Sequence, residues 1–354
     1  MNDTDTELKD RIAGVVLGGA VGDALGLPME GVSRRRARKL FRGPLRHRLV
    51  LGRGMCSDDT EHACMTAAAL LRHPDDADAF ARTLAWKLRW WLLGVPAGVG
   101  LATLKAIVRL WVGVPCDRSG VRSAGNGPAM RAAVIGAFFR GDQRRLREYI
   151  RASTRLTHTD PRAQRGALLV ALAAAQAVRC GHANGFVDVA LRECAGGDDA
   201  QLHAHLLTAA EHLRLGNSPE EFADAIGLSR GVGGYINHTV PVALYCWLRA
   251  PRDIAEAVGA CVALGGDTDS TAAIVGALCG ATGGEPAIPR AWLDGIIEFP
   301  RSVAWMRRLA DDLVARRGPR PRARAMFIPA LLARNLLFTA IVLAHGVRRL
   351  LPPY

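Results

Sequence analysis

The chain has 354 residues, of which 49% are hydrophobic and 6% aromatic, and its formal net charge is +13. This length accommodates one large domain or two ordinary ones, and a core built mainly from Ala, Leu and Val favours packed helices over sheet. The positive charge would attract an anionic ligand. Because the basic residues are scattered and almost all Arg, we expect no specific nucleic-acid partner.

Helical periodicity dominates, and few windows alternate with period two. We therefore predict an all-α fold, a compact multi-helix domain over residues 1–316. Trp86, Trp90 and Trp91 have helical spacing and are interpreted as core. The predicted helices are, in chain order, Thr6–Asp23, Glu61–Leu71, Ala77–Leu93, Leu101–Trp111, Pro128–Phe139, Gln143–Thr154, Pro161–Arg179, Asp199–Leu213, Ser218–Ala225, His238–Leu248, Asp253–Ala263, Ser270–Ala281 and Pro289–Phe299.

The composition changes beyond Arg316. Residues 317–325 are predicted to be a basic, proline-broken linker, and residues 326–354 an apolar C-terminal helix. Its most continuous apolar part, Leu336–Ala344, is too short to span a bilayer, which needs about 20 residues. Three interpretations stay open: a helix docked on the domain or on a dimer partner, a membrane-interface helix flanked by Arg348 and Arg349, and a tilted transmembrane anchor.

The N-terminus and the cysteines point to a cytoplasmic protein, with membrane association through the C-terminal segment left open. Residues 1–10 are polar and acidic, unlike a signal peptide. The eight cysteines include no C-x-x-C pair, and most lie in apolar helical surroundings. We therefore expect neither a disulfide framework nor a zinc site.

Two acidic motifs, Ser57-Asp58-Asp59-Thr60 and Asp267-Thr268-Asp269-Ser270, each precede a predicted helix. One interpretation is that both are helix caps, with Asp58 and Glu61 forming a pair like a capping box. A cap needs one Asp, however, and each motif has two. Carboxylates and hydroxyls suit hard divalent cations. The motifs therefore predict one site for two Mg²⁺ or Mn²⁺ ions, with the ligands Ser57, Asp58, Asp59, Asp267, Asp269 and Ser270.

A binuclear oxygen-ligand site does not by itself name a reaction. Helical isoprenoid-type enzymes also bind Mg²⁺ through acid-rich helices. The run from Asp58 to His62 lacks the third Asp of that pattern, and the acidic residues here lie on loops. This alternative is therefore distant.

Further motifs decide between these possibilities. They are the segment Gly18–Gly26 followed by Pro28-Met29-Glu30, the turn Gly125-Asn126-Gly127, the segment Leu156–Pro161 around His158, and Gly234–Thr239. Together with the acidic motifs they resemble, in order, the motifs of the ADP-ribosylglycohydrolase family, which includes the dinitrogenase-reductase-activating glycohydrolases. The resemblance covers roughly residues 11 to 300 and implies a compact all-α fold with two divalent cations.

The resemblance also implies roles for individual residues. Glu30 falls where the family has an acidic residue near the scissile ribose, and Asp58 and Asp59 are the further catalytic candidates. The substrate-binding candidates are Gly125, Asn126 and Gly127, whose backbone N–H groups suit diphosphate oxygens, His158, and Tyr235, which would stack on adenine. Each has a structural alternative: Asn126 as a left-handed turn residue, His158 and Tyr235 as core residues, and Asp23 of the opening motif as a hydrogen-bonding residue.

The implied activity is metal-dependent hydrolysis of the glycosidic bond at C1″ of an ADP-ribosyl group on a protein or a small conjugate. The metals would orient the ribose and lower the pKa of water, and Glu30 or Asp58 would move the proton. A catalytically inactive ADP-ribose-binding relative is the alternative. The acceptor, whether arginine, serine, another side chain, a nucleic acid or a small conjugate, is not determined by the sequence.

Overall fold

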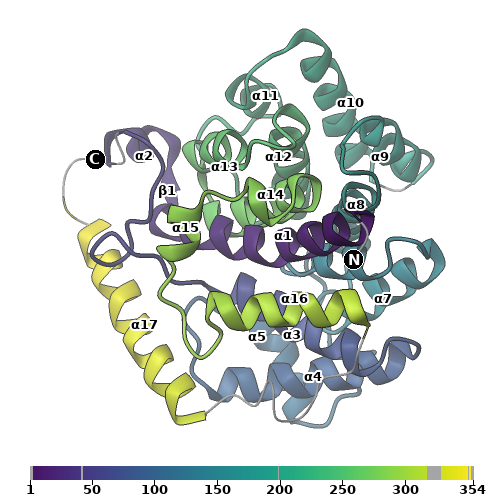
Figure 1. Ribbon diagram of the computed structural model, residues 1–354, viewed down its shortest axis with the longest axis vertical. Coiled ribbons are helices and arrows are strands. Elements are labelled where there is room, and N and C mark those ends of the chain that lie inside the picture. The colour runs from purple at the N-terminus through teal and green to yellow at the C-terminus, as the bar shows by residue number, and fades with distance from the viewer. Residues whose placement is uncertain (1–2, 41–42, 198, 317–327, 350, 352–354) are drawn as a thin grey trace.

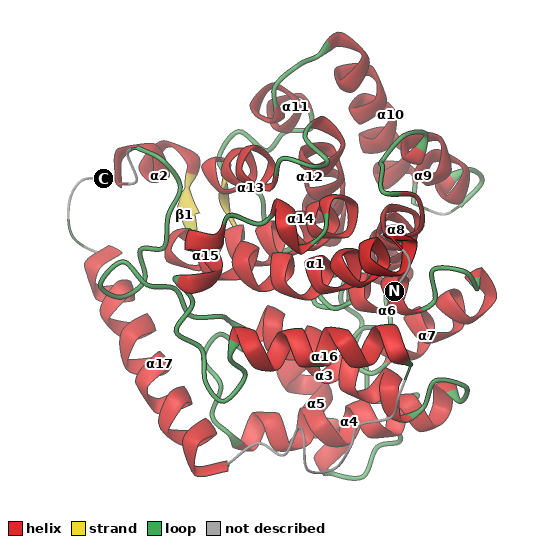
Figure 2. Ribbon diagram, in the orientation of Figure 1, coloured by secondary structure: helices red, strands yellow, loops and turns green. Residues whose placement is uncertain are grey.

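The computed structural model describes residues 3–40, 43–197, 199–316, 328–349 and 351, and their regular secondary structure is almost entirely helix (Figure 1, Figure 2). The all-α prediction is confirmed. The elements before the centre of the chain are α1 (Asp3–Gly26), the 3₁₀ turn η1 (Leu27–Met29), β1 (Val32–Ser33), α2 (Arg34–Leu40), α3 (Asp58–Arg72), α4 (Ala77–Leu93), α5 (Leu101–Trp111), α6 (Ala132–Phe138), α7 (Gln143–Arg155) and α8 (Pro161–Cys180).

The second half continues the helical pattern. Its elements are α9 (Phe186–Cys194), α10 (Ala200–Leu215), α11 (Pro219–Ala225), α12 (Ile236–Arg249), α13 (Ile254–Ala263), β2 (Gly265–Gly266), α14 (Thr268–Gly283), η2 (Glu285–Ala287), α15 (Arg290–Asp294), α16 (Val303–Ala315) and α17 (Ile328–Arg349). β1 and β2 pair in antiparallel fashion, with Val32 opposite Gly266.

Helices α1 and α14 form the centre of the fold, with α12 and α13 on one side and α3 and α16 on the other (Figure 1). A glycine recurs on α1 at every fourth position, which is one helical face. At Gly18 an added Cβ would lie 2.2 Å from the carbonyl oxygen of Gly276, and at Gly22 2.0 Å from that of Ala272. The two backbones therefore touch, and this contact brings the end of α1 to the start of α14.

Most predicted helices are present, and two differ from the prediction for identifiable reasons. Ala77–Leu93 and Leu101–Trp111 match in full. The helix expected from Pro128 begins only at Ala132, because turns such as the bond from Ala129 N–H to the Asn126 carbonyl occupy the preceding residues. The helix expected from Pro289 to Phe299 stops at Asp294, because Gly295 and Ile297 pair with Gly54 instead.

Helices α2, α9 and α16 lie in segments for which no helix was predicted. All three are short, between 7 and 13 residues. Helix α2 is rich in Arg and buries only Arg34 and Ala37, so it has little apolar periodicity to detect.

The interpretation of the tryptophans as core is wrong for two of the three. Trp91 is buried, but Trp86 and Trp90 are 54% and 53% exposed, on the outer face of α4. Helical spacing identifies residues on one stripe but does not say whether another element covers that stripe. The eight cysteines are free thiols, as expected.

Two of the described helices are long and apolar enough to cross a membrane by length and composition, Asp5–Met29 and Pro329–Val347. The first is 94% buried and is the core helix α1. The second is 17% buried and belongs to α17. Helix α17 lies along the edge of the molecule and packs Phe338 against Leu27, Leu49 and Met55 (Figure 1). The predicted linker at 317–325 lies outside the described residues.

Candidate metal centre and cleft

The first acidic motif begins α3, and Asp23 of α1 holds it in place. The Asp23 carboxylate accepts hydrogen bonds from the backbone N–H of Ser57 (2.9 and 3.0 Å) and of Thr60 (3.1 Å), and from the Thr60 hydroxyl. Ser57 is the N-cap, and its hydroxyl accepts from the Asp59 N–H at 3.2 Å. Asp23 thus satisfies N–H groups that a helix start leaves without partners, which supports its interpretation as a hydrogen-bonding residue.

The second acidic motif begins α14 after a tight glycine turn. Gly265 and Gly266 have φ of +70° and +91°, and a Cβ on Gly266 would lie 2.0 Å from the Val232 carbonyl oxygen. Only glycine fits this path. The same turn pairs with β1, and the N–H of Gly31 donates to the Gly266 carbonyl at 2.7 Å. This pairing brings the neighbouring Glu30 to the second motif.

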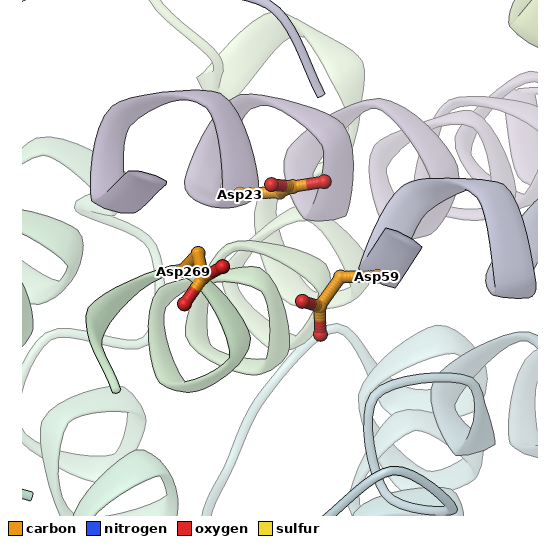
Figure 3. Close-up of side chains that lie close together, drawn as sticks. All are labelled: Asp23, Asp59 and Asp269. Carbon is orange, nitrogen blue, oxygen red and sulfur yellow. The ribbon is translucent and has the colours of Figure 1, made fainter. Parts of the chain in front are cut away.

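The two motifs meet at the end of the α1–α14 pair. Asp23, Asp59 and Asp269 each offer a carboxylate oxygen within 4.8 Å of the others, and Figure 3 shows the three side chains from three different helices. The Asp23 oxygens already accept backbone N–H groups. By contrast, Oδ1 of Asp59 and Oδ1 of Asp269 are buried without a hydrogen-bond partner. Buried acceptors of this kind are costly unless a cation or another donor satisfies them.

The clustering of carboxylates shifts their pKa values upward. Burial raises the pKa of Asp59 well above its usual range, and the nearby charges of Asp58 and Asp23 raise it further. Burial likewise raises the pKa of Asp269, with Glu30, Asp267 and Asp59 adding to the effect. Burial raises the pKa of Asp23 to about 6. Several carboxylates that raise one another's pKa values form a good site for a divalent cation. The positive charge of the cation lowers those pKa values again and favours the ionised carboxylates.

A cavity of about 350 Å³ opens onto this cluster. Most residues predicted for the site line it: Glu30, Asp58, Asp59, Gly125, Asn126, Gly127, His158, Asp267, Asp269 and Ser270. Ser57 and Tyr235 are not among the lining residues. The lining also includes Gly98 of the loop between α4 and α5, and Leu101 and Thr103 of the first turn of α5. The sequence did not point to these residues because they carry little chemistry beyond one hydroxyl.

The glycine–asparagine turn contacts the cavity in a different way from the one expected. The N–H of Asn126 donates to the Gly234 carbonyl at 2.9 Å, and the N–H of Gly125 donates to the Ser123 hydroxyl at 3.2 Å. These two N–H groups are therefore used within the protein, while Gly125, Asn126 and Gly127 line the cavity as expected for a ligand contact. The Asn126 side chain instead donates to Oδ2 of Asp267 at 2.7 Å and orients that carboxylate.

His158 is buried against the same turn. A Cβ on Gly125 or Gly127 would lie 3.1 Å from its ring, so the two glycines make room for the imidazole. Burial, together with the positive charge of Arg131, lowers the pKa of His158 to about 3. His158 therefore enters the cleft as a neutral ring.

Arg131 is a site residue that sequence reasoning missed. It is fully buried, donates to the Ser153 hydroxyl (3.0 Å) and the Thr157 hydroxyl (2.8 Å), and donates to the Gly127 carbonyl at 3.3 Å. The Thr157 hydroxyl in turn bonds to Nδ1 of His158 at 2.9 Å. Arg131 thus fixes both the turn and the histidine from behind.

Tyr235 lies beside the cleft, with its hydroxyl engaged elsewhere. That hydroxyl donates to Gln201 at 2.7 Å and accepts from Arg162 at 3.1 Å. The ring packs edge-on against His238 with centroids 4.9 Å apart. These contacts favour the structural alternative for Tyr235 over adenine stacking.

A buried ion-pair network joins the C-terminal helix to the first acidic motif. Arg334 of α17 donates to both carboxylate oxygens of Glu298, at 2.7 and 2.8 Å. Glu298 accepts from the N–H of Cys56 at 2.9 Å, and Arg334 also donates to the Cys56 carbonyl. Cys56 immediately precedes Ser57, so α17 holds the approach to the metal centre. In the sequence, the sign of this buried ion pair is a single arginine, Arg334, within an otherwise apolar helix.

Comparison with known proteins identifies the family of this chain. The family model described as ADP-ribosylglycohydrolase matches residues 4–322. This chain belongs to the ADP-ribosylglycohydrolase family. The family resemblance seen in the sequence motifs is thereby confirmed.

Three curated relatives of the family indicate the range of similarity. An uncharacterized protein of Archaeoglobus fulgidus is 35% identical over 297 residues, covering 82% of this chain and 92% of the relative. The ADP-ribosyl-[dinitrogen reductase] glycohydrolase of Rhodospirillum rubrum is 26% identical over 333 residues, covering 89% and 99%. The ADP-ribosylhydrolase ARH3 of Gallus gallus is 30% identical over 200 residues, covering 49% and 53%.

A solved structure confirms the family's fold for this chain. It is titled "ADP-ribosylglycohydrolase-related protein complex" and shares 27% sequence identity with this chain at a TM-score of 0.67. The match covers 88% of this chain and 99% of the other.

Proposed function

We propose that this protein is a metal-dependent hydrolase that cleaves the glycosidic bond at C1″ of ADP-ribosyl groups and releases ADP-ribose. The observation that carries the proposal is one cavity lined by carboxylates of both acidic motifs, by Glu30, and by the turn at Asn126 with His158. Family membership gives the hydrolase class. The substrates are ADP-ribosylated proteins or small ADP-ribose conjugates.

The residues present fit two Mg²⁺ or Mn²⁺ ions. Oδ1 of Asp59 and Oδ1 of Asp269 are buried acceptors without partners, and hard cations prefer carboxylate and hydroxyl oxygens. We assign the ligands to Ser57, Asp58, Asp59, Asp267, Asp269 and Ser270. When bound, such ions supply Lewis-acid polarisation and lower the pKa of a nearby water.

The protein's own groups orient the substrate and move the proton. Glu30 lines the cavity beside the proposed metal ligands, of which Asp58 is one. Burial raises the pKa of Asp58, and the charges of Asp23, Glu61 and Glu30 add to this, so one proton is readily held among these carboxylates. We assign Glu30 or Asp58 to the transfer of a proton between water and the leaving group. The remaining negative charges stabilise positive charge that develops at C1″.

The cavity lining combines polar and less polar residues. Asn126, neutral His158 and Asp267 supply polar groups, and Leu101 and Thr103 of α5 line the same cavity. This arrangement suits a nucleotide diphosphate sugar whose ribose reaches the carboxylates while the rest lies along the turn.

The experiment that tests the proposal is the release of labelled ADP-ribose from a panel of substrates with defined linkages, including modified arginine, modified serine and small esters. Each substrate is incubated with Mg²⁺, with Mn²⁺ and with excess chelator. Turnover of at least one linkage only with metal supports the proposal. If calorimetry finds ADP-ribose binding while no linkage is cleaved, the protein is instead a binding relative without catalysis.

A further inference from the structure

Helix α17 has two opposite faces of different character. Arg334, Asn335 and Phe338 are buried against the rest of the protein. The other face carries Leu332, Leu336, Ala340, Leu343 and Val347. At about 100° per residue these five side chains fall within an arc of roughly 80°. The outward face is therefore entirely apolar, where an ordinary surface helix is polar.

This outward face is exposed over its full length. Leu332 is 41% exposed, and Leu336 and Leu343 are each 65% exposed. Further exposed apolar side chains lie near α17 at the end of α4. Asn335 donates to the Gly94 carbonyl at 2.6 Å, and the residues on either side of Gly94, Leu93 and Val95, are 53% and 58% exposed. Contiguous apolar patches of this kind mark interaction surfaces.

The far end of α17 borders a basic part of the protein. Arg36 of α2 donates to the Leu351 carbonyl at 3.0 Å, and His345 bonds to the Leu49 carbonyl. The neighbouring segment 34–53 contributes exposed basic side chains, namely Arg35, Lys39, Arg46 and Arg53. The sequence contains no Asp or Glu between Glu30 and Asp58, and none after Asp312. The border of the apolar face is thus basic overall, although Asp224 and Glu220 pair with Arg34 and Arg38 of α2.

We propose that the outward face of α17 docks on the surface of an anionic lipid bilayer, with the helix lying in the plane of the interface. An apolar helical face bordered by Lys and Arg is the combination that such surfaces bind, since lipid takes up the leucines and anionic headgroups attract the basic residues. Trp86 and Trp90 extend along α4 from the same patch, and Trp is favoured at membrane–water interfaces.

The opposite face of α17 argues against a helix that spans the bilayer. Spanning would remove Arg334 from Glu298 and Asn335 from the Gly94 carbonyl. Breaking a buried ion pair leaves an uncompensated charge on both sides. A second copy of the chain is also a poorer occupant, because it would bring an equally basic border to the interface.

The test is co-sedimentation of the full-length protein with vesicles of phosphatidylcholine alone and with vesicles that also contain phosphatidylglycerol. The test variant is Leu336→Glu with Leu343→Glu. The matched control is Leu207→Glu with Leu215→Glu, two leucines on α10 that are 51% and 54% exposed. Circular dichroism and light scattering report the fold and the oligomeric state of each.

We expect the wild type and the α10 control to bind the anionic vesicles at least about tenfold more strongly than the neutral ones, and the α17 variant to lose at least about tenfold of that binding. High salt should weaken binding, and alkaline extraction should release the protein. The proposal is overturned if anionic vesicles do not bind the wild type, if both double variants bind equally, or if alkaline extraction leaves the protein embedded. A dimer that the α17 variant converts to a monomer, without vesicle binding by the wild type, would assign the face to a second copy instead. Because no readout involves hydrolysis, these outcomes are independent of the proposed activity.

Discussion

Ser270 donates its hydroxyl hydrogen to Oδ2 of Asp59 at 3.0 Å, across 211 positions of the chain. The Ser57 hydroxyl donates to the same oxygen at 3.1 Å. One oxygen of Asp59 is therefore satisfied by both acidic motifs, while its other oxygen has no partner. These two hydrogen bonds join the two motifs in a single site. They leave Oδ1 of Asp59 without a partner, and a cation would bind that atom.

Replacing a ligand should abolish stabilisation by metal without harming the metal-free fold. Asp269→Asn removes one negative charge from a cluster whose members repel one another and so raise one another's pKa values. Without metal we therefore expect the melting temperature of the variant to be unchanged or higher. At a Mn²⁺ concentration a hundredfold above the dissociation constant, the wild type should gain about 2.7 kcal/mol, and the variant should lose most of that gain. Differential scanning fluorimetry with and without MnCl₂ measures both, with Asp117→Asn as the control. An equal gain in both variants would remove Asp269 from the ligands.

The α1–α14 contact should tolerate no side chain on the facing glycines. Gly18→Ala places a Cβ 2.2 Å from the Gly276 carbonyl oxygen, whereas the Cβ of Gly19→Ala would meet its nearest atoms at 3.6 Å. We expect Gly18→Ala to cost roughly 1–3 kcal/mol through overpacking. Gly19→Ala should be neutral or stabilising by up to about 1 kcal/mol, because Ala is the better helix former. Urea unfolding compares the pair, and equal stabilities would contradict the backbone contact.

His158 should make the folded state sensitive to acid. The pKa of His158 is about 3 in the folded protein, mainly because the side chain is buried, whereas a histidine in the unfolded chain has a pKa of 6.5. Between these values the unfolded chain binds a proton that the folded chain does not, so this contribution is fully present above pH 6.5 and is lost as the pH falls toward 3. The slope is about 1.4 kcal/mol per pH unit.

The difference in unfolding free energy between the wild type and His158→Gln isolates this effect, because the carboxylates titrate in both proteins. The difference should shrink by roughly 3 kcal/mol as the pH falls from 6.5 to 4. A difference that stays constant over this range would show that the folded cleft does not lower the pKa of His158.

The sequence predicted the helical class, and most of the residues that it nominated for the site line one cavity, because both leave local signals. Apolar periodicity marks helices such as α4 and α5, and the paired carboxylates at Asp58 and Asp269 stand out in a basic chain. What could not be predicted depends on contacts between distant segments. The N–H groups of Gly125 and Asn126 already donate hydrogen bonds to the Ser123 hydroxyl and the Gly234 carbonyl, and the sequence does not reveal these contacts. Trp86 and Trp90 are exposed because no element covers that stripe in the described chain.

Arg334 should be required for the stability of the metal centre as well as of α17. Arg334→Met keeps an apolar stem but leaves Glu298 buried without its cation, and we expect a loss of about 3–5 kcal/mol. Because Glu298 also holds Cys56, the affinity for Mn²⁺ should fall roughly tenfold or more.

His345→Ala is the matched control for Arg334→Met. It removes the contact of the same helix with the Leu49 carbonyl, which lies outside the Glu298 network. We expect this change to cost only about 1 kcal/mol and to leave Mn²⁺ affinity unchanged in titration calorimetry. If both variants weaken Mn²⁺ binding equally, the docking of α17 in general, and not Arg334, supports the site.

Metal dependence of the site is tested by the rate of ADP-ribose release from an ADP-ribosylated substrate by the wild type and by Asp269→Asn, each with Mn²⁺ and with excess chelator. We expect release by the wild type with metal, and a fall of at least about a hundredfold on chelation or in the variant. Release that continues undiminished in chelator, or in Asp269→Asn, would contradict a metal-dependent site built from the two acidic motifs.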